Sequence, residues 1–350
     1  SIDDIKAEKV LLGFRCKFGV DLNILSLKEL KKIDDLVVEN RVCIKENRVY
    51  NNNFLLADEI ALYILDKKRG KMTIKECVKK YTVYLKNITH IPAKEVEILI
   101  MHLLEKNVIW LHLNYDKAFT KELELEKLVK KRATNFPLEY IIKKASFYGE
   151  QFFTDVDVLI PRPETELLVE NAFEILKEVK NQEKSIKVLE IGTGSGIISV
   201  MLATLLKDKN IDFIAVDINP KAIELARKNA KKFEVLERID FRLSNLFENV
   251  KEDDIFMLIS NPPYIANDYK LPKNVEFEPS NALFGGVVGD ELLKNIIDGA
   301  NSRKIPYVLC EMGFDQKKSL EEYFKEFNVE FYSFYKDYEK FDRGFTLKFK

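Results

Sequence analysis

The chain of 350 residues lacks several features that would each point to a class of function. Its four cysteines lie far apart and include no Cys-x-x-Cys pair, so the sequence predicts neither a zinc site nor a disulfide framework and fits a reducing cytosol. Its longest apolar run, residues 196–206, is too short to cross a bilayer, and the first residues do not resemble a signal peptide. We therefore expect a cytoplasmic protein with no membrane role.

Neither positive nor negative charge is in large excess. The 56 lysines and arginines nearly balance the 57 aspartates and glutamates. This balance argues against wholesale electrostatic binding of nucleic acid, although it allows a local basic patch. With 46% hydrophobic residues, the chain has enough apolar material for a sizeable core, and its length predicts two or more domains.

The first part of the chain is predicted to form a winged-helix-like segment over residues 1–66. A Leu- and Lys-rich run that begins at Ser26, a good N-cap residue, predicts a helix. Residues 41–52 alternate as a small hairpin would, and residues 54–65 predict a short helix. The polar residues 67–71 that follow contain a glycine and predict a linker.

The rest of the chain divides by the period of its apolar residues. From 72 to 143, apolar residues recur three or four apart, which predicts a small helical domain. From 144 to 350, strand-like and helix-like runs alternate, which is typical of an α/β fold with a parallel sheet between helices. The last two strand-like runs have no helix between them, so we expect an antiparallel pair to close the sheet.

A glycine-rich stretch, "EIGTGSG" at residues 190–196, follows the first strand of that region and opens the next helix. Glycines there permit a tight turn and a close approach of a ligand to the backbone. Ile197 stands where a dinucleotide-binding loop has its third glycine, and no Walker lysine follows. Asp217 ends the next strand, where a carboxylate can accept hydrogen bonds from both hydroxyls of a ribose. Together they predict a nucleoside site, whereas the loop alone could be an ordinary strand-to-helix turn.

The stretch "NPPY", Asn261 to Tyr264, follows the fourth strand and so lies at the sheet edge where parallel sheets bind ligands. Pro262 and Pro263 stiffen this loop and keep Asn261 out of helical conformation. The Asn261 side chain and the Pro262 carbonyl then offer two fixed acceptors for a planar NH2 group, which the Tyr264 ring can cover. The motif predicts a site for an amide or an exocyclic amine; a rigid turn is the alternative.

These stretches, with "FYGEQFFTDVDVLIPRPETELLVE" at residues 147–170 and "ALFGGVVGDELLKNII" at 282–297, resemble the peptide release factor glutamine methyltransferases, the PrmC/HemK family. The resemblance runs from about residue 72 to the C-terminus, and "IPRPETE" together with "NPPY" is highly specific to the family. It implies a class I methyltransferase fold with a Rossmann-like domain, S-adenosylmethionine as cofactor, and class 1 peptide chain release factors as partners. The substrate would be the glutamine of their Gly-Gly-Gln motif.

The resemblance also assigns roles to residues of this chain. Residues 72–143 would recognise the substrate. The catalytic residues would be Asn261, Pro262 and Tyr264, and Pro263 would join them in holding the glutamine. The cofactor would be bound by Gly192, Thr193, Gly194, Ser195, Gly196, Asp217, Leu246 and Asn261. Nucleic acid is not an expected partner, and no metal is expected.

One position departs from the family pattern. Where the family usually has Asp in the stretch that contacts the adenine, this chain has Asn245. The oxygen of Asn can still accept from an exocyclic amine. We therefore expect adenine binding to survive with one charge less.

Two alternative functions stay open at this point. An adenine amino-group methyltransferase acting on DNA or RNA would face the same geometric problem as an amide methyltransferase. A non-catalytic binding protein could retain the fold. The stretches "EKVLLGFRCKFGVDLN" and "NNNFLLADEIALYIL" in residues 1–66 weakly resemble the C-terminal end of the HemN/HemW radical S-adenosylmethionine proteins, without their iron–sulfur cysteines. We expect this segment to be a fused remnant of another protein; the alternative is a winged-helix interaction or DNA-binding module.

Overall fold

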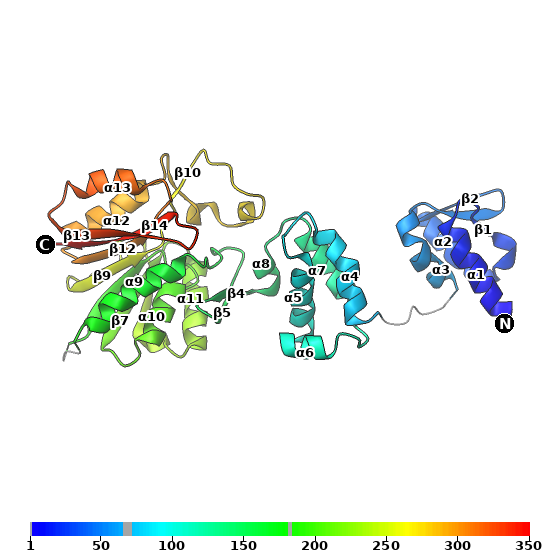
Figure 1. Cartoon of the computed structure of the whole chain (residues 1–350), viewed down its shortest axis with the longest axis horizontal. Coiled ribbons are helices and arrows are strands. Elements are labelled where there is room, and N and C mark those ends of the chain that lie inside the picture. The colour runs from blue at the N-terminus through cyan, green and yellow to red at the C-terminus, as the bar shows by residue number, and fades with distance from the viewer. Residues whose placement is uncertain (1, 66–71, 181–183) are drawn as a thin grey trace. The chain divides into compact units, whose positions relative to one another are not determined.

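The computed structural model describes residues 2–65, 72–180 and 184–350 (Figure 1). The predicted linker, residues 67–71, lies outside the described residues. The chain divides into two compact units, one of residues 1–86 with 91–126 and the other of residues 87–90 with 127–350. The domain boundaries given above stay predictions.

The first described segment has three helices and a small antiparallel sheet of strand order β1-β3-β2. The Ser26 hydroxyl accepts from the Glu29 amide while the Glu29 carboxylate accepts from Ser26, a reciprocal cap that explains why a helix begins here. The predicted helix and hairpin are thus confirmed, and the first helix was not predicted; the winged-helix interpretation stays a prediction. The elements are α1 (Ile2–Arg15), β1 (Val20–Asp21), η1 (Leu22–Ile24), α2 (Leu27–Val38), β2 (Val42–Lys45), β3 (Arg48–Asn51), η2 (Phe54–Leu56) and α3 (Ala57–Ile64).

Residues 72–143 are helical, as their apolar period predicts. Thr73 and Glu76 form a second reciprocal cap, and Pro92 occupies the first turn of a helix, where its missing N–H costs nothing. The helices are α4 (Ile74–Leu85), α5 (Pro92–Leu104), α6 (Val108–Leu113), α7 (Glu122–Arg132) and α8 (Leu138–Ile142).

The second compact unit is built on a seven-stranded sheet of order β13-β14-β12-β9-β6-β7-β8. The run from β12 to β8 is parallel, whereas β14 is antiparallel to both β12 and β13, so the predicted closing pair is confirmed. The strands are β6 (Ile186–Ile191), β7 (Ile211–Asp217), β8 (Ile239–Leu243), β9 (Ile255–Ser260), β12 (Tyr307–Glu311), β13 (Val329–Lys336) and β14 (Asp342–Phe349).

Helices cover both faces of this sheet (Figure 1). One core cluster joins the sheet to α9 (Thr165–Glu178), α10 (Ile197–Leu205) and α11 (Pro220–Lys232), and a second joins it to α12 (Glu291–Ser302) and α13 (Lys317–Phe324). Because both faces are covered, the central strands are continuously apolar rather than alternating. The short elements are β4 (Lys144–Phe147), β5 (Glu150–Phe153), η3 (Leu236–Arg238), β10 (Ile265–Ala266), η4 (Val275–Phe277), η5 (Ser280–Ala282) and β11 (Phe284–Gly286).

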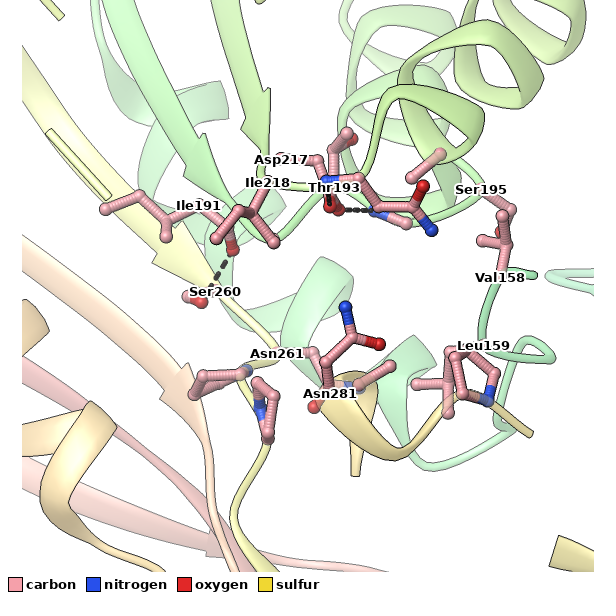
Figure 2. A pocket seen from close by; sticks show the side chains of 18 of the residues that line it. Val158, Leu159, Ile191, Thr193, Ser195, Asp217, Ile218, Ser260, Asn261 and Asn281 are labelled. Atoms are coloured by element: carbon pink, nitrogen blue, oxygen red, sulfur yellow. Dashed lines mark hydrogen bonds between the residues drawn. The ribbon is translucent and has the colours of Figure 1, made fainter. Parts of the chain in front are cut away.

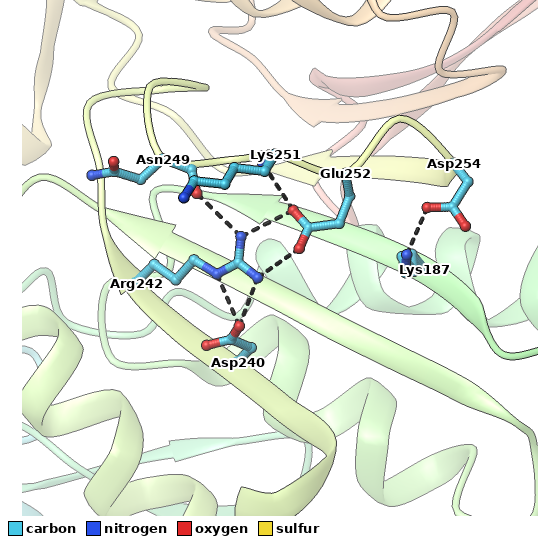
Figure 3. Close-up of polar contacts among 7 residues, drawn as sticks. All are labelled: Lys187, Asp240, Arg242, Asn249, Lys251, Glu252 and Asp254. Carbon is cyan, nitrogen blue, oxygen red and sulfur yellow. Dashed lines mark hydrogen bonds and ion pairs between the residues drawn. The ribbon is translucent and has the colours of Figure 1, made fainter.

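An ion-pair network lies on the edge strand β8 (Figure 3). The Arg242 guanidinium donates to both carboxylate oxygens of Glu252, at 2.7 and 2.9 Å, and to Asp240 at 2.7 Å. The network ties the edge strand to the segment that leads into β9. The hydrogen bonds from Arg242 lower the pKa of Glu252 to about 2.

Candidate active site

A cavity of about 300 Å³ lies at the carboxyl ends of the parallel strands β6, β7 and β9, where the sequence predicted a ligand site (Figure 2). The structure brings most of the predicted site residues together around it. The predicted residues that line the cavity are Gly192, Thr193, Gly194, Ser195, Asp217, Leu246, Asn261, Pro262 and Pro263. Gly196 and Tyr264 are the two predicted residues outside this lining.

The Asp217 carboxylate holds the backbone on two sides of the cavity. Its Oδ2 accepts from the Gly194 amide at 2.9 Å, and its Oδ1 accepts from the Asn219 amide at 2.8 Å. Burial raises the pKa of Asp217, and these backbone hydrogen bonds oppose the rise because they favour the charged form. The lone pairs that these backbone amides leave free can accept from ligand hydroxyls, so the geometry suits the predicted ribose contact.

The glycine loop needs its glycines for two different reasons. Gly194 has a φ of +53°, and the nearest atom to an added Cβ would be 3.9 Å away on Val158, so its conformation is special while the space beside it is open. Gly196 has a φ of +81°, and an added Cβ would lie 3.0 Å from the Cβ of Ala226. Gly196 therefore permits the close packing of α10 on α11, and its predicted contact with the cofactor stays a prediction.

The buried carboxylate of Glu190 stabilises the same loop through hydrogen bonds. It accepts from the Thr193 hydroxyl at 2.9 Å, from the Ser199 amide at 3.2 Å and from the Ser199 hydroxyl. Its side chain is fully buried, which raises the pKa of Glu190 to about 7. In the sequence, Glu190 stands out only as the first residue of the glycine-rich motif. A carboxylate inside an apolar strand, directly before a glycine loop, was the signal for its role.

The "NPPY" segment follows β9 and divides between the cavity and the protein interior. Asn261, Pro262 and Pro263 line the cavity, as expected. The Tyr264 hydroxyl instead donates to the Oε1 atom of Glu311 at 3.0 Å, and this contact directs the tip of the ring to the end of β12. The expectation that Tyr264 covers a substrate amide stays a prediction.

The "IPRPETE" segment closes the cavity on another side. The amide of Ile160 donates to Glu278 at 3.1 Å, and the Arg162 guanidinium pairs with the same carboxylate at 2.5 Å. Glu278 is almost fully buried and directly precedes Pro279, which also lines the cavity. The motif therefore fastens the segment around Glu278 over the site, a contact across more than a hundred residues that spacing alone cannot reveal.

Asn245, the residue that departs from the family pattern, also lines the cavity. Its Nδ2 donates to the Glu248 carboxylate at 3.1 Å. Because a carboxylate accepts only, this bond identifies the nitrogen end of the amide and leaves the oxygen of Asn245 as the acceptor for a ligand. The arrangement supports the expected adenine contact.

Neither a metal site nor a membrane-spanning helix is found in the described part of the chain. Among those residues, no group of three or more His, Cys, Asp and Glu could hold a metal ion. None of the described helices is both long and apolar enough to span a membrane. His112, in the helical region, stacks on Tyr115 at a centroid distance of 5.7 Å.

Comparisons with known proteins agree with this geometry. The model of the PrmC N-terminal domain matches residues 76–142, and that of the methyltransferase small domain matches residues 165–276. The release factor glutamine methyltransferase of Aquifex aeolicus is 31% identical over 284 residues, which cover 79% of this chain and 95% of that protein. The chain belongs to the release factor glutamine methyltransferase family. The resemblance inferred from the motifs and the class I methyltransferase fold are thereby confirmed.

Two further relatives are similar to this chain over different shares of their own length. The release factor glutamine methyltransferase of Buchnera aphidicola is 34% identical over 285 residues, which cover 78% of this chain and 98% of that protein. The bifunctional methyltransferase of Rickettsia conorii is 33% identical over 279 residues, which cover 72% of this chain. The chain spans only about half, 53%, of the length of that bifunctional relative.

Proposed function

We propose that this protein transfers a methyl group from S-adenosylmethionine to the side-chain amide nitrogen of the glutamine in the Gly-Gly-Gln motif of class 1 peptide chain release factors. The observation that carries the proposal is a single cavity lined both by Asp217, a ribose acceptor, and by Asn261 and Pro262, acceptors for an NH2 group. Membership of the family supports the same substrate.

The residues present fit S-adenosylmethionine. Asp217 offers its free lone pairs to the ribose hydroxyls, and the oxygen of Asn245 accepts from the adenine amine. Leu246 and Ala222 give the cavity apolar walls against which a purine can pack. The open space beside Gly194 lets the ligand approach the backbone.

The chemistry needs alignment more than acid or base. When bound, S-adenosylmethionine supplies an electrophilic methyl group on a sulfonium sulfur. An amide nitrogen is a poor nucleophile because its lone pair is delocalised into the carbonyl. The Asn261 oxygen and the Pro262 carbonyl accept from the two N–H bonds of the glutamine, which raises electron density on nitrogen and aims it at the methyl. The nitrogen gains a carbon and releases one proton to solvent.

Positioning is the main contribution asked of the protein. Holding the reacting atoms at near-attack distance supplies about 7 to 11 kcal/mol of the barrier in well-oriented systems. Transfer also neutralises the positive charge on sulfur, which a site that excludes water favours. The stiff prolines of the loop hold both acceptors ready before the substrate arrives.

We assign the remaining parts of the chain by the same reasoning. Residues 72–143 are proposed to recognise the release factor, and residues 144–350 to carry the reaction. Residues 1–66 are proposed to be a fused remnant of another protein. We also propose that the protein is cytoplasmic and does not bind nucleic acid.

One assay tests the proposal against its alternatives. The protein is incubated with labelled S-adenosylmethionine and, in separate reactions, with a release factor, with the same factor carrying Ala in place of the motif glutamine, with DNA and with RNA. We expect one methyl group on the intact release factor and none elsewhere, as read by mass spectrometry of the peptide. Label on adenine in DNA or RNA would overturn the assignment.

A further inference from the structure

Asn261 does not stand alone at the end of β9 but is joined to a chain of buried polar groups. Its Nδ2 donates to the Thr165 hydroxyl at 3.0 Å. That hydroxyl donates to Oε2 of Glu311 at 2.7 Å, and Tyr264 donates to Oε1 of the same carboxylate at 3.0 Å. Thr165 and Glu311 are almost completely buried, with exposed fractions of 0% and 1%.

The fold brings these residues together from three elements. Glu311 ends β12, which pairs in parallel with β9 so that Cys310 lies beside Ser260, and Glu311 and Asn261 are the next residues along the two chains. Thr165 is the first residue of α9, which packs against the sheet. The "IPRPETE" and "NPPY" motifs are therefore linked directly, by Asn261 and Thr165, and a second time through Glu311, which neither motif contains.

The hydrogen bonds that join Asn261, Thr165 and Glu311 allow only one assignment of donors and acceptors while Glu311 is ionised. A carboxylate accepts only, and a threonine hydroxyl carries a single proton. Since Thr165 gives that proton to Glu311, it can only accept from Asn261, and the group that donates to it must be the NH2 end of the amide. The oxygen of Asn261 is then the end left for the substrate.

From this we infer that Thr165 and Glu311 are positioning residues that select the amide rotamer of Asn261 in which its oxygen, rather than its NH2 group, faces the substrate glutamine. The inference rests on the proposed function for its substrate, while the arrangement itself belongs to the free protein. A flipped amide would present donors to the donors of the glutamine and abolish the alignment. Neither residue needs to touch substrate or cofactor to have this effect.

Protonation of Glu311 would remove the selection. Burial raises the pKa of Glu311 to about 7, against the opposing hydrogen bonds from Thr165 and Tyr264. A protonated Glu311 can donate to Thr165, which then donates to the oxygen of Asn261. The side-chain amide of Asn261 can then flip and point its NH2 group at the substrate. The charged and titratable groups that face Glu311 are Glu164 on the approach to α9, Tyr264 after β9, Tyr335 on β13 and Arg343 on β14.

Two variants of Thr165 separate positioning from packing. Thr165→Val keeps the shape and removes the hydroxyl, so kcat on the release factor should fall about ten- to a hundredfold, the loss expected when a buried donor is left without its partner. Thr165→Ser keeps the hydroxyl and should restore most of the rate. Thr204→Val is the matched control, because that hydroxyl binds only the Val200 carbonyl within α10 and should leave kcat unchanged.

The pH profile distinguishes this role from a structural one. In the parent protein kcat should rise as the pH increases through about 7, since ionised Glu311 selects the productive rotamer. In Thr165→Val and in Glu311→Gln that inflection should be absent. A parent profile that is flat from pH 6 to 8, or an unaltered profile and rate in Thr165→Val, would overturn the inference while leaving the proposed function intact.

A spectroscopic measurement tests the arrangement without any substrate. In protein labelled with ¹⁵N-asparagine, the side-chain signal of Asn261 is identified by its loss in Asn261→Ala. We expect this signal to titrate near pH 7 in the parent and not in Thr165→Val, whether or not a release factor is methylated. An Asn261 signal that ignores both pH and the Thr165 substitution would show that no such selection exists.

Discussion

Removal of the Asp217 side chain tests the cofactor site most directly. Its two oxygens accept from the Gly194 and Asn219 amides, the Ile218 amide adds a third backbone contact, and the remaining lone pairs can accept from the ribose hydroxyls. Asp217→Ala removes both ligand contacts and these backbone contacts. A hydrogen bond to a charged group is worth about 1.5 to 3 kcal/mol, so the dissociation constant of S-adenosylmethionine should rise by at least about ten- to 150-fold.

The Asn variant refines this prediction. In Asp217→Asn one end of the amide is an NH2 group, and it must face either the Gly194 or the Asn219 amide, both of which are donors. The substitution should therefore weaken binding as well, although it preserves the shape. A role that depended only on packing would make Asp217→Asn harmless.

Isothermal titration calorimetry with S-adenosylmethionine, or with its demethylated product, measures the effect. Asp212→Ala is the matched control, because Asp212 lies on the same strand at its exposed amino end and contacts Ser185 rather than the cavity. Unchanged cofactor affinity in Asp217→Ala would refute the assignment of Asp217 as the ribose acceptor.

Three further variants probe the substrate, the loop and the edge of the sheet. Asn261→Ala should lower the single-turnover rate about a hundred- to a thousandfold with a much smaller effect on cofactor affinity; a near-normal rate would reduce "NPPY" to a rigid turn. Gly196→Ala should lower both the melting temperature and cofactor affinity, because a φ of +81° is strained for any side chain and an added Cβ would lie only 3.0 Å from Ala226; an unchanged thermal melt would contradict this. Glu252→Gln should cost about 1 kcal/mol of unfolding free energy at pH 7 because it breaks the paired bonds to Arg242. Since pairing lowers the pKa of Glu252 to about 2, the stability that the ion pair adds is complete above the pKa of an unpaired carboxyl and is lost as the pH falls towards 2. Denaturant unfolding should therefore show a difference in stability between the parent and Glu252→Gln that shrinks in acid. A difference that does not change with pH would exclude the ion pair as its cause.

Local patterns in the sequence were enough to predict the fold class, most helices and strands, and the residues at the strand ends that line the site. The alternating runs predicted the parallel sheet, because strands buried on both faces must be apolar throughout. The capping residue Ser26 placed the start of α2 correctly, since a cap acts over three residues. The glycine loop, Asp217 and "NPPY" were found because each lies at the end of a predicted strand, and parallel strands bring those ends to one edge.

Only the tertiary structure decided how those residues are held. Glu190 and Glu311 look in sequence like polar interruptions of a strand, and their hydrogen bonds to Thr193 and Thr165 depend on which helix packs over which strand end. Thr165 lies 96 residues from Asn261 and 146 from Glu311, so no local pattern relates them. Tyr264 shows the same limit, because the rigid loop that fixes its backbone does not say whether its hydroxyl meets a substrate or a buried carboxylate. The direction of a side chain depends on its neighbours in space, and those neighbours are set by strand order and helix packing rather than by the motif that contains it.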